Sequence, residues 1–450
     1  MRMAAAKSAV LVSSMVVLVC VGGSTQGQER TVDLAEIQLG ARLFSDDRFC
    51  SPKGDLRNSC SSCHMSDQSP EGPRAYTDFL TRSWVPWRTG DPRRDGVRNA
   101  PTILDLSDAP RLHYDGEFTS LEGLAKGTLT GRSMGWLAAE ESEAMDHFYK
   151  AILADKREGS GPSYSEEFKS AYDCEITGLD SRRVVELASK SLAAYMRTLK
   201  SGRNTPYDQF IKANELPAGP EGKEKPREFA ARLLARLSSM ERAGQLNTTA
   251  AFGKKAVDGL KVFMRTEGDA AGNCATCHVP PLFTDFSFHN IGISQAEYDS
   301  VHGMGSFARL PIPDGARAAR PSVQFKETAR SEKPGYADLG YWNFVSLGGP
   351  DSLAGEKPAD LLRRMIGAMK TPTLRNLAYS FPYMHNGVYP TLEDALGEII
   401  DMSQLSRDGK VRSADPELPR ITITGADTAR LEAFLNTLND DLDHQHHSKH

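Results

Sequence analysis

Two short motifs in this sequence carry residues that could bind a redox cofactor. CSSCH occupies residues 60–64, CATCH occupies residues 274–278, and the chain has seven cysteines in all. A C-x-x-C-H motif is the attachment signature of c-type haem: the two thiols add to the vinyl groups of one porphyrin, and the histidine binds the iron. The candidate haem-binding residues are Cys60, Cys63, His64, Cys274, Cys277 and His278.

Two other functions of such motifs explain the pattern less well. A zinc site needs four ligands that meet at one ion, and these two motifs lie in different halves of the chain. A disulfide within each pair of cysteines leaves both following histidines unexplained. We therefore predict two covalently bound c-type haems, with His64 and His278 as the proximal ligands of the two irons.

The length and composition are typical of a multidomain globular protein. The chain has 450 residues, enough for two or three domains, and 39% of them are hydrophobic and 25% charged. The net charge of -5 argues against a nucleic-acid-binding protein, which would usually carry a concentrated basic patch.

The N-terminus has the pattern of an export signal. Arg2 and Lys7 precede an apolar run over residues 9–21, and small residues follow at positions 22–24. This order predicts a signal peptide over residues 1–25. The run is short for a membrane span, although an uncleaved anchor is the alternative. We therefore expect the protein in the bacterial periplasm, where c-type haem is attached.

Two cysteines remain once the signal peptide and the haem motifs are set aside. Removal of the signal peptide would remove Cys20, and four cysteines belong to the two motifs, which leaves Cys50 and Cys174. An oxidising compartment permits a disulfide between them. Two buried thiols are the equally plausible alternative.

The elements that must position these residues are predicted to be mainly helical. Apolar residues recur at helical spacing, and Asp180 precedes one such run as a helix cap. The predicted helices cover residues 34–44, 138–153, 164–172, 181–198, 228–243 and 428–438. Residues 65–97 are rich in Pro, Gly, Asp and Arg, and we expect them to form long loops around the first haem.

An internal duplication supports two similar domains. The order Pro-Thr, then Asp-Gly or Asn-Gly, then Leu-Glu occurs twice, and each haem motif follows a similar short segment. The matching pairs are 101–102 with 372–373, 115–116 with 386–387, 121–122 with 392–393, and 40–44 with 259–263. We therefore expect two homologous c-type cytochrome domains that face each other, each with one haem.

The predicted domain boundaries follow from the duplication and from composition. Residues 217–227 are rich in Pro, Gly, Lys and Glu, which is typical of a linker. The expected organisation is an N-terminal cytochrome domain over 30–215, a linker and connecting helix over 216–250, a C-terminal cytochrome domain over 251–443, and a His-containing tail over 444–450.

With these residues identified, the chain resembles the bacterial di-haem cytochrome c peroxidase family, which includes the MauG-type enzymes. The resemblance covers essentially the whole mature chain. Its motifs are RNAPT at 98–102, Asp-Gly at 115–116, FHNIG at 288–292, TPTLRN at 371–376 and PYMH at 382–385.

The resemblance implies a function for each haem and a link between them. In this family the N-terminal haem activates peroxide, and the C-terminal haem supplies or stores an oxidising equivalent. An aromatic residue between the haems, usually Trp, relays electrons. The matching position is Tyr114. Tyr can also carry a radical, so Tyr114 is the candidate inter-haem relay; the alternative is that it only packs between the domains.

The resemblance also implies a calcium ion at the domain interface. The matching positions are Asn99, Ser380 and Pro382, the last two through their carbonyl oxygens. Amide and carbonyl oxygens suit a hard cation. Water in the same place is the alternative.

This sequence departs from the family pattern around the first haem. No histidine occurs between His64 and His113, so we expect an open, five-coordinate iron, as in MauG-type enzymes. The stretch that usually reads Glu-Met-Gly begins here with Ser133, which is a poor substitute for a carboxylate in moving a proton on peroxide. The acidic residues nearby are Glu140, Glu141 and Glu143, for which a solvated helical run is the favoured interpretation.

A third departure concerns the second haem. The position that usually supplies a distal Met or Tyr is Ile399, which cannot bind iron. Met402, one helical turn later, is the nearest substitute, and its thioether would raise the reduction potential. Because a Met in a helix more often belongs to the core, a packing role is the favoured alternative.

Three hypotheses follow. The first is a periplasmic oxidoreductase that reduces hydrogen peroxide with electrons from a small redox protein, either a c-type cytochrome or a cupredoxin. The second is a MauG-type enzyme that oxidises side chains of a partner protein, which the open haem and the missing Glu favour. The third is a di-haem electron carrier without peroxide chemistry. Family members are often homodimers, although no feature of this sequence indicates a dimer interface.

Overall fold

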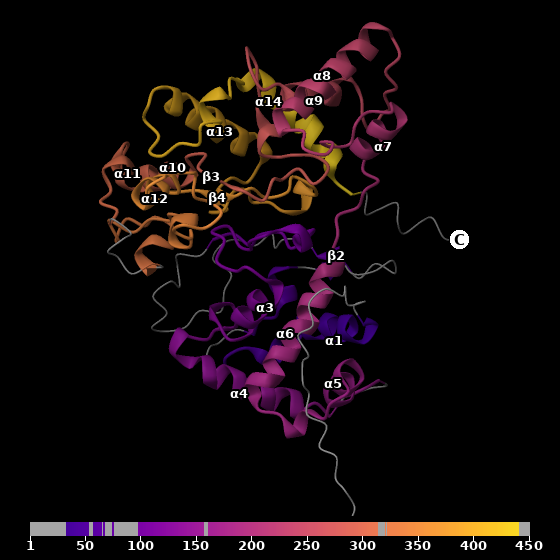
Figure 1. Cartoon of the computed structure of the whole chain (residues 1–450), viewed down its shortest axis with the longest axis vertical. Helices are drawn as coiled ribbons and strands as arrows, with labels where there is room; N and C mark the ends of the chain where they lie inside the picture. Colours follow the sequence, from indigo (N-terminus) through magenta and orange to yellow (C-terminus); the bar gives the residue numbers. More distant parts are fainter. Residues whose placement is uncertain are drawn as a thin grey trace, which may run out of the picture.

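The computed structural model describes residues 33–53, 57–64, 66–67, 74–75, 98–156, 161–313, 320 and 322–440. The predicted signal peptide, the His-containing tail and most of the predicted haem loops over 65–97 lie outside these residues. The described chain is mainly helical, as predicted, and its helices form two halves, one above the other in Figure 1. None of the helices described here is long and apolar enough to cross a membrane.

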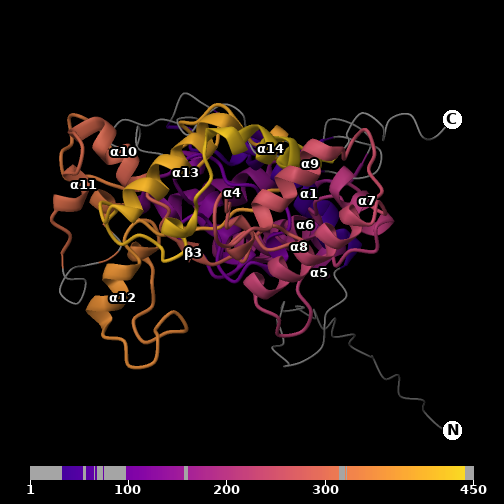
Figure 2. The ribbon, with the colours of Figure 1, turned by 90° about the horizontal axis from the view of Figure 1, so that it is seen from above.

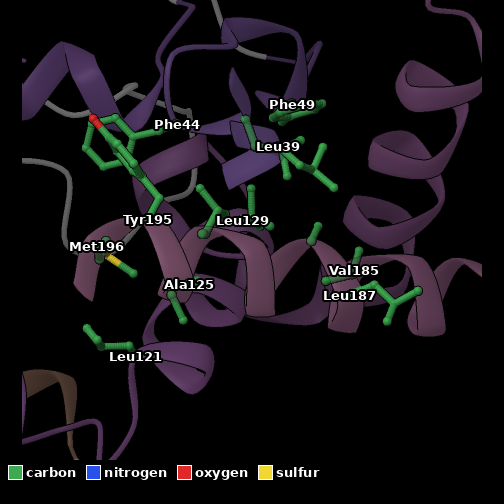
Figure 3. Packing of buried hydrophobic residues seen from close by; sticks show 14 of the residues in the cluster. Leu39, Phe44, Phe49, Leu121, Ala125, Leu129, Val185, Leu187, Tyr195 and Met196 are labelled. Carbon is green, nitrogen blue, oxygen red and sulfur yellow. The ribbon is translucent and has the colours of Figure 1, made fainter. Parts of the chain in front are cut away.

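The helices of the first half are α1 Leu34–Phe44, α2 Cys60–Cys63, α3 Leu121–Leu129, α4 Glu141–Leu153, α5 Tyr164–Tyr172 and α6 Ser181–Thr198. Helix α6 has the longest buried face, and α1, α3 and α4 pack against it. Figure 3 shows this core, in which side chains such as Phe44 and Tyr195 meet edge to face with ring centroids 5.2 Å apart.

The helices of the second half are α7 Pro206–Ala213, α8 Pro226–Arg242, α9 Lys254–Met264, α10 Ile293–His302, α11 Ser306–Arg309, α12 Pro358–Arg364, α13 Leu392–Arg407 and α14 Gly425–Leu435. Helices α7, α8, α9 and α14 share one core, in which Tyr207 and Phe263 both pack near Phe434. From above, as in Figure 2, α10, α11 and α12 lie to one side of α13 and α14.

The strands within the described residues form two short antiparallel pairs. Strand β1 Ser66–Asp67 pairs with β2 Arg74–Ala75, and β3 Phe288–His289 pairs with β4 Met369–Lys370. The segment between β3 and β4 contains α10, α11 and α12 and builds a separate core around Tyr341 and Trp342. This additional core was not predicted, because its helices are short and its apolar residues lack a clear period.

The predicted domain boundary at residue 215 stays a prediction, and the two cores lie on either side of residues 200–206. The first core ends at Leu199 and the second begins at Tyr207. Helix α8, which we predicted to connect the domains, buries Phe229 and Leu233 in the second core. The reason is that α7 and α8 are amphipathic and need an apolar surface, which only the second half offers them.

Paired glycines show how closely the two halves follow one plan. A Cβ atom on Gly40 of α1 would lie 2.0 Å from the carbonyl oxygen of Ser191 in α6. A Cβ atom on Gly259 of α9 would lie 1.9 Å from the carbonyl oxygen of Arg430 in α14. In each half, a helix that precedes the haem motif, α1 or α9, therefore crosses the last helix of that half in backbone contact at a glycine, which supports the predicted duplication.

Candidate haem sites

The first haem motif lies at a short helix. Helix α2 carries Cys60 and Cys63, and His64 follows as its C-terminal cap, with its amide donating to the carbonyl of Cys60 at 2.9 Å. The Nδ1 atom of His64 is buried without a hydrogen-bond partner. Burial, with a smaller effect of His113, lowers the pKa of His64 to about 4. A buried, neutral imidazole is the form that binds iron.

The second motif repeats this geometry. The amide of His278 donates to the carbonyl of Cys274 at 2.8 Å, as His64 does to Cys60. The Nδ1 atom of His278 lies 3.0 Å from the carbonyl oxygen of Phe283 and donates to it. Metal-binding histidines usually make such a bond with their second ring nitrogen, because it fixes the orientation of the ring.

The four cysteines of the motifs are present as free thiols. None is joined to another by a disulfide, so the alternative of a C-x-x-C disulfide does not hold. Burial raises the pKa of the Cys60 and Cys274 thiols to about 12. Both motifs therefore present paired thiols beside a buried imidazole, which fits a c-type haem in each half.

A cavity of about 230 Å³ adjoins the second motif. Cys274, Cys277 and His278 line it, together with apolar side chains of α9, α13 and α14. The cavity extends to the interface between the halves, where its wall includes Tyr114 from the first half. A largely apolar pocket that contains the motif histidine, His278, fits a porphyrin, whose faces are apolar and whose iron needs an axial ligand.

Tyr114, the candidate relay, lies at this interface. Its ring is 6.3 Å from the ring of His385, centroid to centroid. The amide of Lys370 donates to the Tyr114 carbonyl at 2.7 Å. Burial raises the pKa of the Tyr114 phenol well above its ordinary range, so the phenol is protonated. The structure thus places Tyr114 in contact with the second half, close to the cavity.

A buried ion-pair network joins the halves next to Tyr114. Arg98 donates to Asp115 of its own half at 2.5 Å and to both carboxylate oxygens of Asp338 in the other half, at 2.5 and 2.7 Å. The Arg98 side chain is 11% exposed and the carboxylates 1–2%. His385 lies 4.0 Å from Asp338, measured from Nε2 to Oδ2. This network fixes how the two halves sit against each other.

The residues of the predicted calcium site are brought together. Asn99, Ser380 and Pro382 all line the cavity, and the Asn99 Nδ2 atom donates to the Pro382 carbonyl at 2.5 Å. The Asn99 Oδ1 atom is buried without a hydrogen-bond partner. An unsatisfied amide oxygen beside a carbonyl fits a hard cation that needs oxygen ligands. Calcium at this site stays a prediction.

Met402 is not placed as an iron ligand. It packs with Val411 and Leu418 in a small core, and a Cβ atom built on Gly292 would lie 2.7 Å from its sulfur. Ile399 lines the cavity, whereas Met402 does not. Residues three positions apart share a helix face, so the register alone does not explain this difference. The packing of Met402 with Val411 and Leu418 agrees with the favoured packing role.

The acidic run near the first haem forms surface ion pairs. Lys53 binds Glu140 at 3.1 Å and Glu143 at 2.5 Å, and Lys126 binds Glu141 at 3.1 Å. These contacts agree with the favoured interpretation of a solvated helix. Ser133 is exposed and its carbonyl accepts from Asn58. A distal acid is therefore not identified among these residues.

Cys50 and Cys174 are not joined by a disulfide. Both are buried, but they belong to different hydrophobic clusters. The Cys50 sulfur lies 3.8 Å from the Met134 sulfur, and burial raises the pKa of the Cys50 thiol. Two buried thiols are therefore the correct alternative.

No role was predicted for His289, although it belongs to the FHNIG motif at residues 288–292. The Nδ1 atom of His289 lies 2.7 Å from Asp415 and its Nε2 atom lies 2.9 Å from Asp285. Burial opposes protonation, but these two carboxylates raise the pKa of His289 well above 6.5. His289 lines the cavity beside Cys277. Because Asp415 comes from a distant segment, only the position of His289 after the second motif could have signalled it.

Comparisons with known proteins agree with this architecture. Residues 34–216 match the family described as di-haem cytochrome c peroxidase. The chain is 26% identical over 407 residues to cytochrome-c peroxidase IdrP2 of Denitromonas iodatirespirans, covering 90% of this chain and 81% of that protein. It is 25% identical over 404 residues to methylamine utilization protein MauG of Methylorubrum extorquens, covering 90% and 78%.

A solved structure shares the fold. The diheme peroxidase BthA from Burkholderia thailandensis is similar with a TM-score of 0.56 and 20% identity, covering 91% of this chain and 86% of that one. The family match, the similar full-length relatives and the two histidine-cysteine sites agree with the resemblance found in the sequence. The comparisons identify the chain as an oxidoreductase that is similar to the di-haem cytochrome c peroxidases.

Proposed function

We propose that this protein is a periplasmic peroxidase that reduces hydrogen peroxide to water with two electrons from a small redox protein, a c-type cytochrome or a cupredoxin. The observation that carries the proposal is the position of Tyr114, which lies at the interface between the halves and lines the cavity that contains His278. A chain with one haem in each half needs such a group if the halves are to exchange electrons.

The chain's own residues have defined roles in this proposal. His64 and His278 hold the two irons, and the four motif cysteines tether the porphyrins. The bound haems supply the electron-transfer and peroxide chemistry. Tyr114 conducts electrons between the halves, and the Arg98 network holds it in register with the second half. Calcium at Asn99, Ser380 and Pro382 would stabilise the same interface.

A second function is favoured by one specific feature. Ser133 stands where the family usually has a carboxylate, and its side chain cannot carry a proton between the oxygens of peroxide as well as Glu. Slow peroxide turnover would suit MauG-type oxidation of a partner protein, in which oxidising equivalents are held until the partner arrives. An electron carrier without peroxide chemistry is the third hypothesis.

The test uses holoprotein matured in a bacterial periplasm. The ferric spectrum is recorded first, and peroxide consumption is then followed with a reduced c-type cytochrome as electron donor. Sustained turnover with a high-spin resting haem supports the peroxidase. A single reaction followed by long-lived oxidised species supports the MauG-type function. Low-spin spectra that neither peroxide nor cyanide changes support the carrier.

A further inference from the structure

The two repeats exchange equivalent backbone contacts across the interface. The amide of Asn99 donates to the carbonyl of His385 at 2.8 Å, and the amide of Lys370 donates to the carbonyl of Tyr114 at 2.7 Å. Asn99 lies two residues before Pro101, and Lys370 lies two residues before Pro372, the matching prolines of the duplication. The two hydrogen bonds are therefore equivalent. The first repeat donates to the second repeat in one of them, and the second repeat donates to the first in the other.

The side chains of the same two residues repeat the relationship. The Asn99 amide donates to the carbonyl of Pro382, and the Lys370 Nζ atom donates to the carbonyl of Arg111 at 3.2 Å. Pro382 is three residues before His385, and Arg111 is three residues before Tyr114. Each side chain thus reaches the equivalent carbonyl of the opposite loop.

The two loops have the same backbone structure around these carbonyls. The amides of Ala109 and Ser380, at equivalent positions, each donate to the carbonyl three residues earlier, at 3.1 and 3.2 Å. Isolated β-bridges close the two loops at equivalent places, one pairing Leu112 with Phe118 and the other Tyr383 with Tyr389. The carbonyls that could bind a cation in one loop therefore have counterparts in the other loop.

The two sites differ in the charge that they already contain. Asn99 is neutral, and its buried oxygen lacks a hydrogen-bond partner, so this side offers a place for a cation. Lys370 is 7% exposed and brings its own positive charge to the other side. Burial disfavours this charge and lowers the pKa of Lys370 to about 8, and the Asp115 carboxylate, which is itself bound by Arg98, partly offsets the effect of burial. The buried Lys370 ammonium, which donates to the Arg111 carbonyl near Asp115, therefore lies where a metal ion would bind in the equivalent site.

We propose that Lys370 is a positioning residue whose ammonium is a built-in cation. It holds the loop over residues 109–118, and with it Tyr114, against the second half, where the other repeat has its candidate calcium site. The inference rests on the proposed function for the role of Tyr114 as a relay and for calcium at Asn99. The position of the loop itself is tested independently of both.

The test compares holoprotein variants by hydrogen exchange of the peptide that covers residues 109–118. Lys370→Met removes the charge and keeps the backbone amide, and it is expected to speed exchange by about tenfold or more, because a hydrogen bond from a buried charge is lost. Lys370→Asn copies the other repeat. In chelator, its peptide over residues 109–118 is expected to exchange as fast as in Lys370→Met. When calcium is supplied, the protein is expected to bind one additional calcium ion, and the exchange of this peptide is expected to slow again.

The exposed Lys357→Met is the matched control and should change nothing. The proposal is overturned if the peptide exchanges in Lys370→Met at the wild-type rate, or if calcium does not protect it in Lys370→Asn. The second outcome is decisive because a calcium ion could not take over from a lysine that only packs. If chelator leaves the wild-type loop over 380–389 unchanged, the calcium prediction fails instead. If Tyr114→Phe leaves electron transfer unchanged, the relay fails, and the exchange results still decide the role of Lys370.

Discussion

Tyr114 and His385 face each other across the interface between the halves, with ring centroids 6.3 Å apart and ring planes inclined at 63°. They occupy equivalent positions in the two repeats, since each precedes an Asp-Gly or Asn-Gly pair. The pseudo-twofold relation of the repeats therefore brings the two side chains together. Of this pair, only the tyrosine has the phenol that the proposed relay requires.

Replacement of Tyr114 by Phe is expected to slow electron transfer between the haems by about tenfold or more, equivalent to at least ~1.4 kcal/mol in the barrier. Phe keeps the ring but lacks the phenol that makes a tyrosine easier to oxidise. Flash photolysis of half-reduced holoprotein measures the rate. Tyr149→Phe, which loses only a bond to the Ile176 carbonyl within the first half, is the control. Equal rates in wild type and Tyr114→Phe would rule out the relay.

Replacement of Met402 by Leu is expected to leave the ferric and ferrous spectra of the second haem unchanged. The Met402 side chain packs with Val411 and Leu418 and does not line the cavity. The swap conserves volume, so it should cost less than about 1.5 kcal/mol in unfolding free energy. Loss of a low-spin signal, or a large fall in the reduction potential of one haem, would show that Met402 does bind the iron.

Replacement of Arg98 by Met is expected to lower the free energy of unfolding by about 3–5 kcal/mol, because it leaves Asp115 and Asp338 buried without their cation. Denaturant titration measures this change. Arg183→Met, which removes a more exposed contact with Glu186, should cost no more than about 1 kcal/mol. Equal effects of the two substitutions would mean that the network does not hold the halves together.

Replacement of Gly259 by Ala is expected to destabilise the second half by about 1–3 kcal/mol, because the new Cβ atom would overlap the Arg430 carbonyl of α14. Gly397 in α13 has no atom within 4 Å of a built Cβ atom. Gly397→Ala should therefore be neutral or stabilising by up to ~1 kcal/mol from helix propensity. Thermal unfolding of both variants checks the contrast, and a neutral Gly259→Ala would mean that α9 and α14 are less closely packed.

Protection of residues 109–118 is expected to depend on pH near 8. Burial lowers the pKa of Lys370 to about 8, against a smaller opposing effect of Asp115. The ammonium is therefore charged below pH 8 and loses its proton as the pH rises through 8. Because the opened, hydrated loop restores the ordinary higher pKa, it binds more protons than the closed loop above pH 8, and a rise in pH favours closure. Hydrogen exchange of this peptide, corrected for the intrinsic pH dependence, should slow down between pH 7 and about 9 in wild type. In Lys370→Met the corrected rate should stay constant.

The sequence by itself predicted the haem-attachment residues and determined the mainly helical fold and the repeat. These depend on local patterns: a pentapeptide with fixed spacing, helical periodicity, and segments such as 40–44 and 259–263 that match along the chain. Helices α1, α5 and α6 begin and end where predicted, because caps such as Asp33 and Asp180 are adjacent in sequence to the helices that they start.

Only the tertiary structure decided which distant residues meet. The pairing of Arg98 with Asp338, and of His289 with Asp415, joins segments more than a hundred positions apart, and no local pattern carries that information. The same holds for Met402, whose direction depends on the rotation of α13 against its neighbours, and for Cys50 and Cys174, which different cores keep apart. Lys370 is a further example. The sequence shows that residue 370 is a lysine, but only the packing of the two repeats shows that it makes the contact with the first repeat that Asn99 makes with the second.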